Sequence, residues 1–384
     1  MIYFDNAATT GKKPQSVIKA VDDALKFLSA NPGRSGHELS AKTAEKIFAV
    51  RQKTADFFGA SGPENVVFTL NCTHSINCVL KGVLNKGDHV IVSSLEHNAV
   101  MRPLKKMKVP FDMARVSLEN DDETVMEFAK KIRPNTKLIL TTGASNVLGK
   151  ILPIKRIGEL CKKRGILFAV DAAQSAGVIP INMQEMGIDY LCIASHKGLY
   201  APMGTGILIA EKPIENTLIE GGTGTNSIEL FQPRFLPERM ESGTVNVSGI
   251  MGIGAGIDYV KEIGLERLYN HEMNLTEMLY DRLRNNPEIE LYTPWPKRDL
   301  YAPVLSFNLK EIPSEKTAMA LSANGIAVRG GLHCSPMAHK QIETLETGCV
   351  RVSFATFNTE TEVKRFLNVI SDKNFLKNLK KAIE

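Results

Sequence analysis

Several polar side chains that could take part in acid–base or covalent chemistry follow short apolar runs of the sequence. Lys197 comes after one such run, and a desolvated lysine can form an adduct with an aldehyde. Asp171 closes another, very apolar run, where a carboxylate is costly to bury unless a cationic group meets it. That partner could be an arginine or a protonated pyridine nitrogen, and the residues alone leave both open.

Thr73 and His74 stand at the start of an expected helix at 75–84. The N–H groups there and the Thr73 hydroxyl could hold a phosphate, because the N-terminal end of a helix carries partial positive charge. Alternatively, Thr73 is only the N-cap of that helix. Further polar residues follow the apolar runs, namely His97, Asn146, Gln174, Ser195 and His196.

A second group of candidate residues follows another expected strand, in a turn that contains two adjacent glycines. It ends in Cys334, which could be a small buried apolar residue or a nucleophile. Paired glycines fit a flexible loop, and positive charge from Arg329 and His333 would favour the thiolate form of Cys334. These two features favour a nucleophilic role for Cys334 over a buried structural one.

The elements that would position these residues alternate between strands and helices from about residue 40 to residue 210. Strands are expected at 66–69, 89–92, 137–140, 166–170, 191–193 and 204–209, and helices at 75–84 and 154–164. This alternation favours an α/β fold with a mostly parallel sheet covered on both faces. Ligands of such sheets bind beyond the carboxyl ends of the strands, so the polar groups are expected to form one site.

The pattern changes near residue 248, which predicts a second, smaller α+β domain. Helical sequence runs from 250 to about 284, strands are expected near 304–309, 326–329 and 350–354, and helical sequence returns from 361. We therefore expect a large domain at 15–247 and a small domain formed by 1–14 and 248–384. A chain of 384 residues is long enough for two domains.

Composition excludes several classes of function. The formal charge of +5 is small and dispersed, so no nucleic acid is expected as a partner. No apolar stretch approaches the ~20 residues that span a bilayer, and the first residues do not read as a signal peptide, so a cytoplasmic protein with no membrane association is expected. The six cysteines show no CxxC spacing, so neither disulfides nor a metal site is expected.

The segments at 171–175 and 195–198 resemble the pyridoxal 5′-phosphate (PLP) site of class V aminotransferase-like enzymes. Within that group, cysteine desulfurases and selenocysteine lyases are most similar. The resemblance covers nearly the whole chain, from 3–10 to 351–354 and 358–359. It implies the aspartate aminotransferase-like fold, with a seven-stranded-type sheet in the large domain.

The resemblance also implies roles around the cofactor. Lys197 would carry PLP covalently, Asp171 would pair with the pyridinium nitrogen and Gln174 would bind the phenolate oxygen. His97 would stack on the ring, while Thr73, His74 and His196 would hold the phosphate. One departure concerns the family's Ser or Thr two residues before this histidine, because Ala194 stands there. Ser195 beside it is counted among the cofactor-binding residues, and which residue replaces the family contact is left open.

For the reaction, the resemblance implies conversion of L-cysteine to L-alanine, with sulfur left on Cys334 as a persulfide and a sulfur-acceptor protein as a possible partner. Arg351 would grip the substrate carboxylate, with Asn146 and Arg329 nearby, and His97 could accept the substrate thiol proton. Leu332 departs from the family motif, which often has His there. Thr244 matches a residue that reaches the phosphate of the other subunit, which implies a homodimer.

Three alternatives stay open. The first is selenocysteine lyase, and the second is another class V reaction, such as that of a transaminase, an epimerase or a β-lyase. The third, from a different class, is a PLP-fold protein without catalysis that only relays sulfur. Production of alanine and sulfide, as opposed to a keto acid, distinguishes these possibilities.

Overall fold

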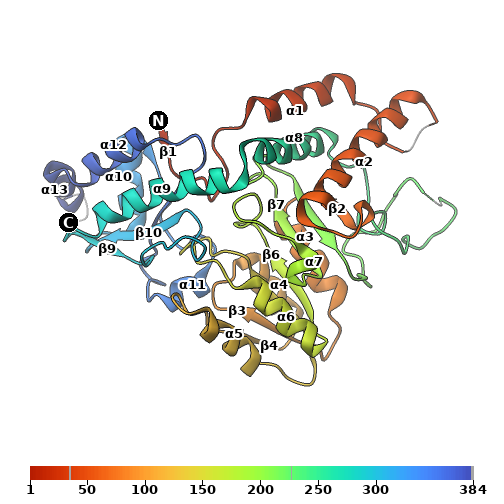
Figure 1. Cartoon of the computed structure of the whole chain (residues 1–384), viewed down its shortest axis with the longest axis horizontal. Coiled ribbons are helices and arrows are strands. Elements are labelled where there is room, and N and C mark those ends of the chain that lie inside the picture. The colour runs from red at the N-terminus through yellow and green to blue at the C-terminus, as the bar shows by residue number, and fades with distance from the viewer. Residues whose placement is uncertain (34–35, 226, 382–384) are drawn as a thin grey trace.

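The computed structural model describes residues 1–33, 36–225 and 227–381 and is built on a seven-stranded sheet in the order β2-β8-β7-β6-β5-β3-β4 (Figure 1). Its strands are β2 (Val66–Thr69), β3 (His89–Ser93), β4 (Phe111–Ala114), β5 (Thr136–Thr142), β6 (Leu167–Asp171), β7 (Tyr190–Ala194) and β8 (Gly206–Ala210). Neighbouring strands are parallel except that β8 is antiparallel to both β2 and β7. The predicted mostly parallel sheet is therefore confirmed.

Successive side chains of a strand point to opposite faces of a sheet, and here the side chains on each face pack into a hydrophobic core. Val90 and Val92 pack into one hydrophobic core with α3 (Cys72–Val83) and α4 (Asn98–Met107). Ile91 packs into the core on the other face. That core also takes in residues of α2 (Glu38–Phe58), α5 (Asp121–Lys130), α6 (Ile154–Arg164) and α7 (Met183–Met186). Burial on both faces explains why the strands read as continuous apolar runs.

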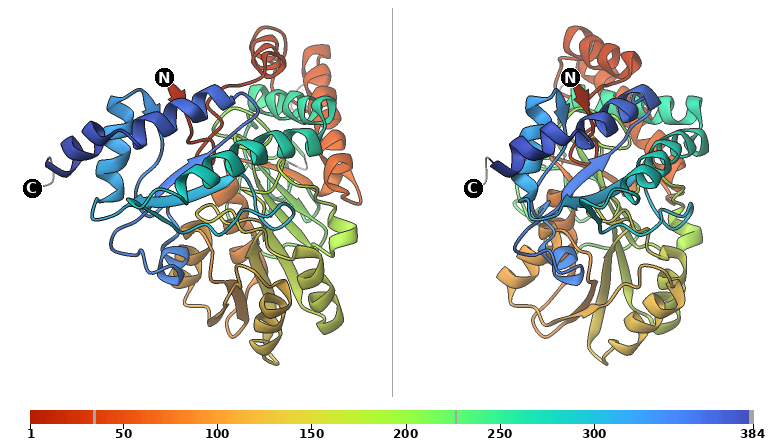
Figure 2. Two further views of the ribbon diagram at one scale, coloured as in Figure 1. Left: turned by 60° about the vertical axis from the view of Figure 1, so that its left-hand side comes forward. Right: turned by 90° about the vertical axis from the view of Figure 1, so that its left-hand side faces the viewer.

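The small domain contains the antiparallel sheet β12-β10-β9, and the strand that opens the chain pairs in parallel with β11. These strands are β1 (Ile2–Tyr3), β9 (Ile289–Leu291), β10 (Val304–Leu309), β11 (Ile326–Ala327) and β12 (Val350–Ser353). The helices in this part of the chain are α9 (Leu265–Leu283), α10 (Ser314–Ala323), α11 (Pro336–Gln341), α12 (Glu360–Ile370) and α13 (Lys373–Lys381). Figure 2 shows the N-terminal strand lying beside these helices.

Helix α8 (Val247–Ile263) lies beside α1 (Gln15–Phe27) and α2 at the top of Figure 1. Its residues Ile250, Ile253 and Ile257 belong to the core of the large domain. Gly264, with φ of 90°, separates α8 from α9. We therefore propose that α8 counts with the large domain, and that the boundary expected at 247/248 lies near Gly264.

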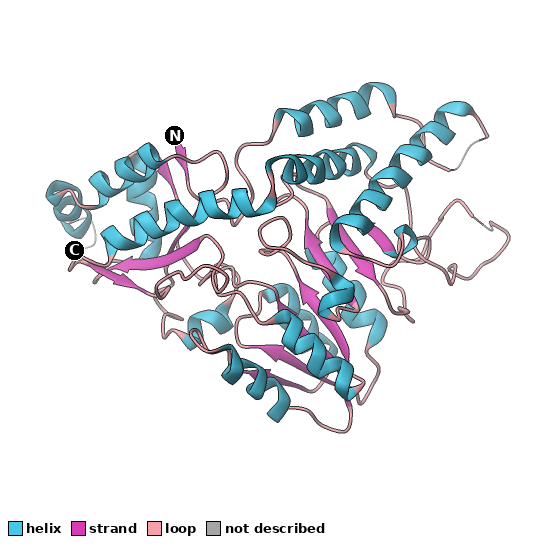
Figure 3. Ribbon diagram, in the orientation of Figure 1, coloured by secondary structure: helices cyan, strands magenta, loops and turns pink. Residues whose placement is uncertain are grey.

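The segment between β8 and α8 has no helix or strand in the part that the structure describes, and Figure 3 shows it as a loop that projects from the large domain. The short helix η1 (Pro63–Asn65) completes the regular elements. Among the described residues, no helix has the length and apolar character to cross a membrane.

Candidate active site

The five strand ends that carry polar residues meet at one pocket of about 220 Å³. The lining includes Asn71, Cys72 and Thr73 after β2, His97 after β3, Thr142 and Asn146 at and after β5, Asp171, Ala173 and Gln174 at and after β6, and Ala194, His196 and Lys197 at and after β7. We call this set the sheet wall. The convergence predicted from the sequence is confirmed, since these strands run in one direction and end at one edge.

Lys197 and Asp171 both line this pocket. Burial lowers the pKa of the Lys197 amine, while the nearby Asp171 carboxylate opposes that shift. The short loop from Ala194 to Tyr200 is fixed by the Lys197 N–H donating to the Ala194 carbonyl at 3.3 Å and by the Tyr200 N–H donating to the Lys197 carbonyl at 2.9 Å. A lysine in this setting loses its proton more readily than one in water, as an amine that reacts with a carbonyl must.

Asp171 is oriented by Cys72, which sequence analysis left without a role. The Cys72 thiol donates to Asp171 Oδ1 at 3.3 Å, and the Ala173 N–H donates to the same oxygen at 3.0 Å. Cys72 and Asp171 are both buried. Burial and the Asp171 carboxylate raise the pKa of the Cys72 thiol, so it stays protonated and acts as a donor. This contact holds one carboxylate oxygen and leaves the other to meet a ligand.

His97 caps α4, because the Ala99 N–H donates to its Nδ1 at 3.0 Å. Burial lowers the pKa of His97, partly offset by Asp171, so the ring is neutral. With Nδ1 as acceptor, the proton of the neutral ring is assigned to Nε2. His97 would therefore accept a thiol proton only by giving up its bond to Ala99.

Glu96 is a fully buried carboxyl next to His97 that sequence analysis also left without a role. Its Oε1 accepts from the Ser93 hydroxyl and, at 2.8 Å, from the Thr142 N–H. Burial raises the pKa of Glu96 to about 8, so it is largely neutral below that pH. The neutral carboxyl joins the ends of β3 and β5, from which His97 and Asn146 extend.

The N-terminal segment lies against the sheet wall and holds its main-chain groups. Gln174 Nε2 donates to the Ala7 carbonyl at 2.8 Å. Thr10 Oγ1 and Lys13 Nζ donate to the His196 carbonyl at 3.1 and 3.0 Å. A sequence pattern could not reveal these contacts, because they join segments that are far apart in the chain.

The small domain contributes Arg351, whose side chain is only 1% exposed. Its Nη2 forms an ion pair with Asp5 Oδ1 at 2.6 Å, and its Nη1 donates to the Asn146 carbonyl at 3.0 Å. Burial lowers the pKa of Arg351, and Asp5 counteracts that shift. Asp5 thus balances a buried charge that lines the pocket, and sequence analysis gave it no role.

Cys334 lies on the segment 329–335, which we call the cysteine loop, and Arg329 and His333 of this loop line the pocket. The Cys334 thiol is exposed, and Arg329 Nη2, from a residue that lines the pocket, lies 3.8 Å from Cys334 Sγ. His333 and Cys334 have φ of 51° and 58°, in the left-handed region that costs a residue with a side chain about 1–3 kcal/mol. The expectation that Arg329 places positive charge near the thiol is confirmed.

The expected contribution of His333 to that charge is wrong. Its ring is buried and its Nε2 lies 3.0 Å from the Cys349 carbonyl. Burial, together with the charges of Arg351 and Arg329, lowers the pKa of His333 to about 2, so the ring is neutral. The ring also lies in a buried cluster with His339 and Cys349.

The paired glycines of the cysteine loop meet a packing requirement. A Cβ on Gly330 would lie 2.6 Å from the Ser314 carbonyl oxygen. Gly331 has φ of 103° and packs against Gly348. The close approach of the Ser314 main chain therefore explains Gly330, and the positive φ explains Gly331, whereas sequence analysis attributed both glycines to loop flexibility.

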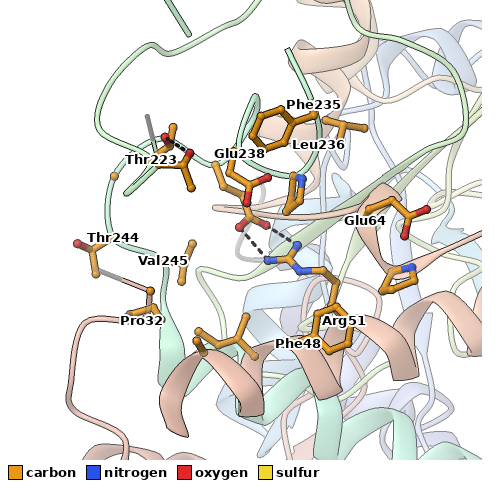
Figure 4. A pocket seen from close by; sticks show the side chains of 18 of the residues that line it. Pro32, Phe48, Arg51, Glu64, Thr223, Phe235, Leu236, Glu238, Thr244 and Val245 are labelled. Atoms are coloured by element: carbon orange, nitrogen blue, oxygen red, sulfur yellow. Dashed lines mark hydrogen bonds and ion pairs between the residues drawn. The ribbon is translucent and has the colours of Figure 1, made fainter. Parts of the chain in front are cut away.

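Besides Cys334, three predicted site residues lie outside the pocket lining. His74 accepts the Leu70 N–H at 3.3 Å through its Nδ1, and the buried hydroxyl of Ser195 has no hydrogen-bond partner among the described residues. Thr244 is exposed and lines a different cavity of about 550 Å³, beside the Arg51–Glu241 ion pair (Figure 4). Within one chain, the structure does not bring these three side chains to Lys197.

A fold of this kind, with a lysine and a carboxylate facing each other at the carboxyl edge of the sheet, is typical of PLP-dependent transferases. The profile of the family described as "Aminotransferase class-V" matches residues 2–366. The chain therefore belongs to the class V aminotransferase family, whose members are PLP-dependent enzymes.

Several similar proteins are named cysteine desulfurases. A probable cysteine desulfurase of Pyrococcus abyssi is 34% identical over 97% of this chain and 94% of its own length. A cysteine desulfurase of Haloferax volcanii is 30% identical over 96% and 88%. Among solved structures, a cysteine desulfurase from Thermococcus onnurineus superposes with a TM-score of 0.86 at 33% identity, covering 96% of this chain and 93% of that one. One from Escherichia coli gives 0.85 at 25% identity, covering 98% and 94%.

Proposed function

We propose that this protein is a cysteine desulfurase that uses PLP to convert L-cysteine to L-alanine and leaves the sulfur on Cys334. The observation that carries the proposal is the exposed Cys334 thiol beside Arg329, a residue that lines the same pocket as Lys197, Asp171 and Arg351. The names of the relatives support the same activity. A transaminase or epimerase would have no use for a thiol in this position.

The donor set of the pocket fits PLP. Lys197 would hold the cofactor covalently, and Asp171, with one oxygen free of its Cys72 contact, would pair with the ring nitrogen. His97 would cover the ring, and Thr73 at the N-terminal end of α3 and His196 would hold the phosphate. When bound, the cofactor withdraws electrons from the substrate Cα. Contacts of Ser195 and His74 with the cofactor stay predictions.

Other residues would bind the substrate and transfer protons. Arg351 would bind the substrate carboxylate with the guanidinium edge that faces the pocket, and Asn146 lies beside it. Lys197 would remove a proton from the substrate Cα and return it. Because the neutral His97 ring carries its proton on Nε2, its first role here is to cover the ring, and proton acceptance requires release of Ala99.

The sulfur step balances without an added oxidant. The Cys334 thiolate would attack the substrate sulfur, so an S–S bond forms as the substrate Cβ–S bond breaks. The electron pair of the broken bond stays with the carbon skeleton, which takes up a proton and leaves as L-alanine. The persulfide then sits on an exposed side chain, where a sulfur-acceptor protein can reach it.

We further propose a homodimer in which Thr244 completes the phosphate site of the partner. Thr244 is exposed and remote from Lys197 in its own chain. The same projecting segment presents Ile228, Leu230 and Phe231, which are 98%, 97% and 86% exposed. Large apolar side chains exposed together favour contact with another protein surface. Sedimentation tests the dimer, and mixing Lys197→Ala with Thr244→Ala subunits should restore activity if sites are shared.

The experiment that tests the activity supplies the purified holoenzyme with amino acids one at a time. L-cysteine with a reductant should give L-alanine and sulfide in equal amounts. A keto acid in place of alanine would contradict the proposal and favour a transaminase. Much faster turnover of L-selenocysteine would favour a selenocysteine lyase.

A further inference from the structure

Cys334 stands between two residues that are held by the same amide of the large domain. Asn146 Nδ2 donates to the His333 carbonyl at 2.8 Å, and Asn146 Oδ1 accepts from the Ser335 hydroxyl at 2.6 Å. Ser335 is fully buried and Asn146 is 9% exposed. One side chain thus holds the cysteine loop on both sides of its thiol.

The position of Ser335 shows that its hydroxyl is not used in the ordinary way. Ser335 is the N-cap of α11, where a serine usually accepts a hydrogen bond from the second or third N–H of the helix. The Ser335 side chain makes no such capping bond. Its hydroxyl points to Asn146, so helix capping does not account for a serine here.

The backbone around Cys334 needs such anchors. Two successive left-handed residues with side chains persist only where surrounding contacts fix them. A third contact from the large domain reaches Cys334 itself, because the Asn98 N–H donates to the Cys334 carbonyl at 2.7 Å. Three hydrogen bonds therefore attach three successive residues of the strained turn to the sheet wall and to the start of α4.

We propose that Ser335 is a positioning residue, which acts through Asn146 to hold the Cys334 thiol at the distance needed to attack the substrate sulfur. The inference rests on the proposed desulfurase function. Arg351 donates to the Asn146 carbonyl, so the group that would bind the substrate carboxylate and the loop that carries the thiol share one residue. Asn146 thereby fixes the separation between the two ends of the bound substrate.

The test compares Ser335→Ala with the wild-type holoenzyme in two steps of one reaction. Ser335 does not line the pocket, so Ser335→Ala removes no group that would touch the cofactor or the substrate. The first readout is single-turnover loading of sulfur on Cys334, followed by mass spectrometry. The second is solvent deuterium exchange at Cα of L-alanine, which requires Lys197 and Arg351 but no thiol.

We expect Ser335→Ala to slow sulfur loading roughly tenfold to a hundredfold, since a displacement of about 1 Å has that effect on a reacting pair, and to leave Cα exchange within about twofold of wild type. Ser335→Thr keeps the hydroxyl and should recover most of the loading rate. Ser40→Ala is the matched control, because it removes an equally buried serine hydroxyl, bonded to the Asn31 carbonyl at 2.7 Å.

A wild-type rate of sulfur loading in Ser335→Ala would overturn the proposal. An equal fall in the rates of sulfur loading and of Cα deuterium exchange would also overturn it, because the hydroxyl would then support the whole pocket. Amide hydrogen exchange gives an independent measure of the anchor: Ser335→Ala should exchange faster at 331–336 than wild type, with α3 unchanged. If the wild type loads no sulfur on Cys334, the proposed desulfurase function is wrong. If amide hydrogen exchange at 331–336 is the same in Ser335→Ala as in the wild type, the proposed role of Ser335 is wrong, whatever the function.

Discussion

The sheet wall and the cysteine loop face the same pocket but are built in opposite ways. The sheet wall extends from buried strands, and its side chains are fixed by short loops and by partners such as Cys72 at Asp171. The cysteine loop lies between a two-residue strand and a six-residue helix, has two strained residues and exposes its thiol. Groups that hold a ligand thus sit on the rigid sheet, and the group that passes sulfur on sits where another molecule can reach it.

The surroundings of the ionisable groups also differ between the sheet wall and the cysteine loop. Burial raises the pKa values of Cys72 and Glu96 in and beside the sheet wall, which keeps both groups neutral. Cys334 is the one exposed cysteine among the described residues and has the Arg329 guanidinium beside it. Of these two thiols, only that of Cys334 is therefore both exposed and next to a cation.

The largest effect is expected from the sheet wall. Lys197→Ala should abolish turnover of L-cysteine, because the amine would both carry the cofactor and move the Cα proton. Borohydride reduction of the wild-type holoenzyme followed by peptide mapping should label Lys197. Lys212→Ala serves as control, and a label on any other lysine would contradict the assignment.

The corresponding change in the cysteine loop should stop only the sulfur step. Cys334→Ser should lower the rate of alanine formation by roughly 10³-fold or more, since a hydroxyl is a far weaker nucleophile toward sulfur at neutral pH. Bound PLP and its absorption spectrum should stay as in wild type. Cys161→Ala is a control with a remote buried thiol. Near-normal alanine formation in Cys334→Ser would show that the cysteine loop does not carry out the sulfur step.

Arg351 lines the same pocket as the sheet wall, and its substitution tests substrate binding. Arg351→Lys keeps the charge but loses the two-pronged guanidinium, so we expect KM for L-cysteine to rise roughly tenfold to a hundredfold with a smaller change in kcat. Steady-state kinetics measure this. Arg298→Lys, which alters a surface pair with Glu277, should leave KM unchanged. An unchanged KM in Arg351→Lys would place the carboxylate contact elsewhere.

The smallest effect concerns the buried carboxyl beside the sheet wall. Glu96 has a pKa of about 8 in the folded chain against an ordinary value of 4.5, so between these values the folded state binds more protons than the unfolded state. The free energy of unfolding attributable to Glu96 therefore falls as pH rises from about 4.5 to about 8.

Glu96→Gln removes this titration while keeping the shape of the side chain. Its Tm relative to wild type should rise by a few degrees between pH 5 and pH 8. Parallel scans of wild type and variant at these two pH values measure the difference. Glu272, a buried carboxyl with a similarly raised pKa, titrates in both proteins and cancels in the comparison. A constant difference in Tm would show that Glu96 is ionised in the fold.

Local sequence predicted much of the large domain. The bounds expected for β2, α6 and β10 agree with the structure, because each is a periodic or continuous apolar segment between clear stops. Strands β4 and β9 were not predicted, since their side chains are partly exposed and form no apolar run. The expected domain boundary placed α8 with the small domain, whereas its apolar face packs against α2 and the sheet.

By itself, the sequence indicated the chemical content of the site, because Lys197, Asp171, His97, Cys334 and Arg351 stand out by residue type, by the strand that each follows or lies on and by the ordered motifs that resemble the family. Only the tertiary structure decided which groups modify them. Asp5 reaches Arg351, Ser335 reaches Asn146, and burial makes His333 neutral. Such pairings depend on where distant segments meet and on how much water is excluded there, and neither quantity is encoded in the local pattern around a residue.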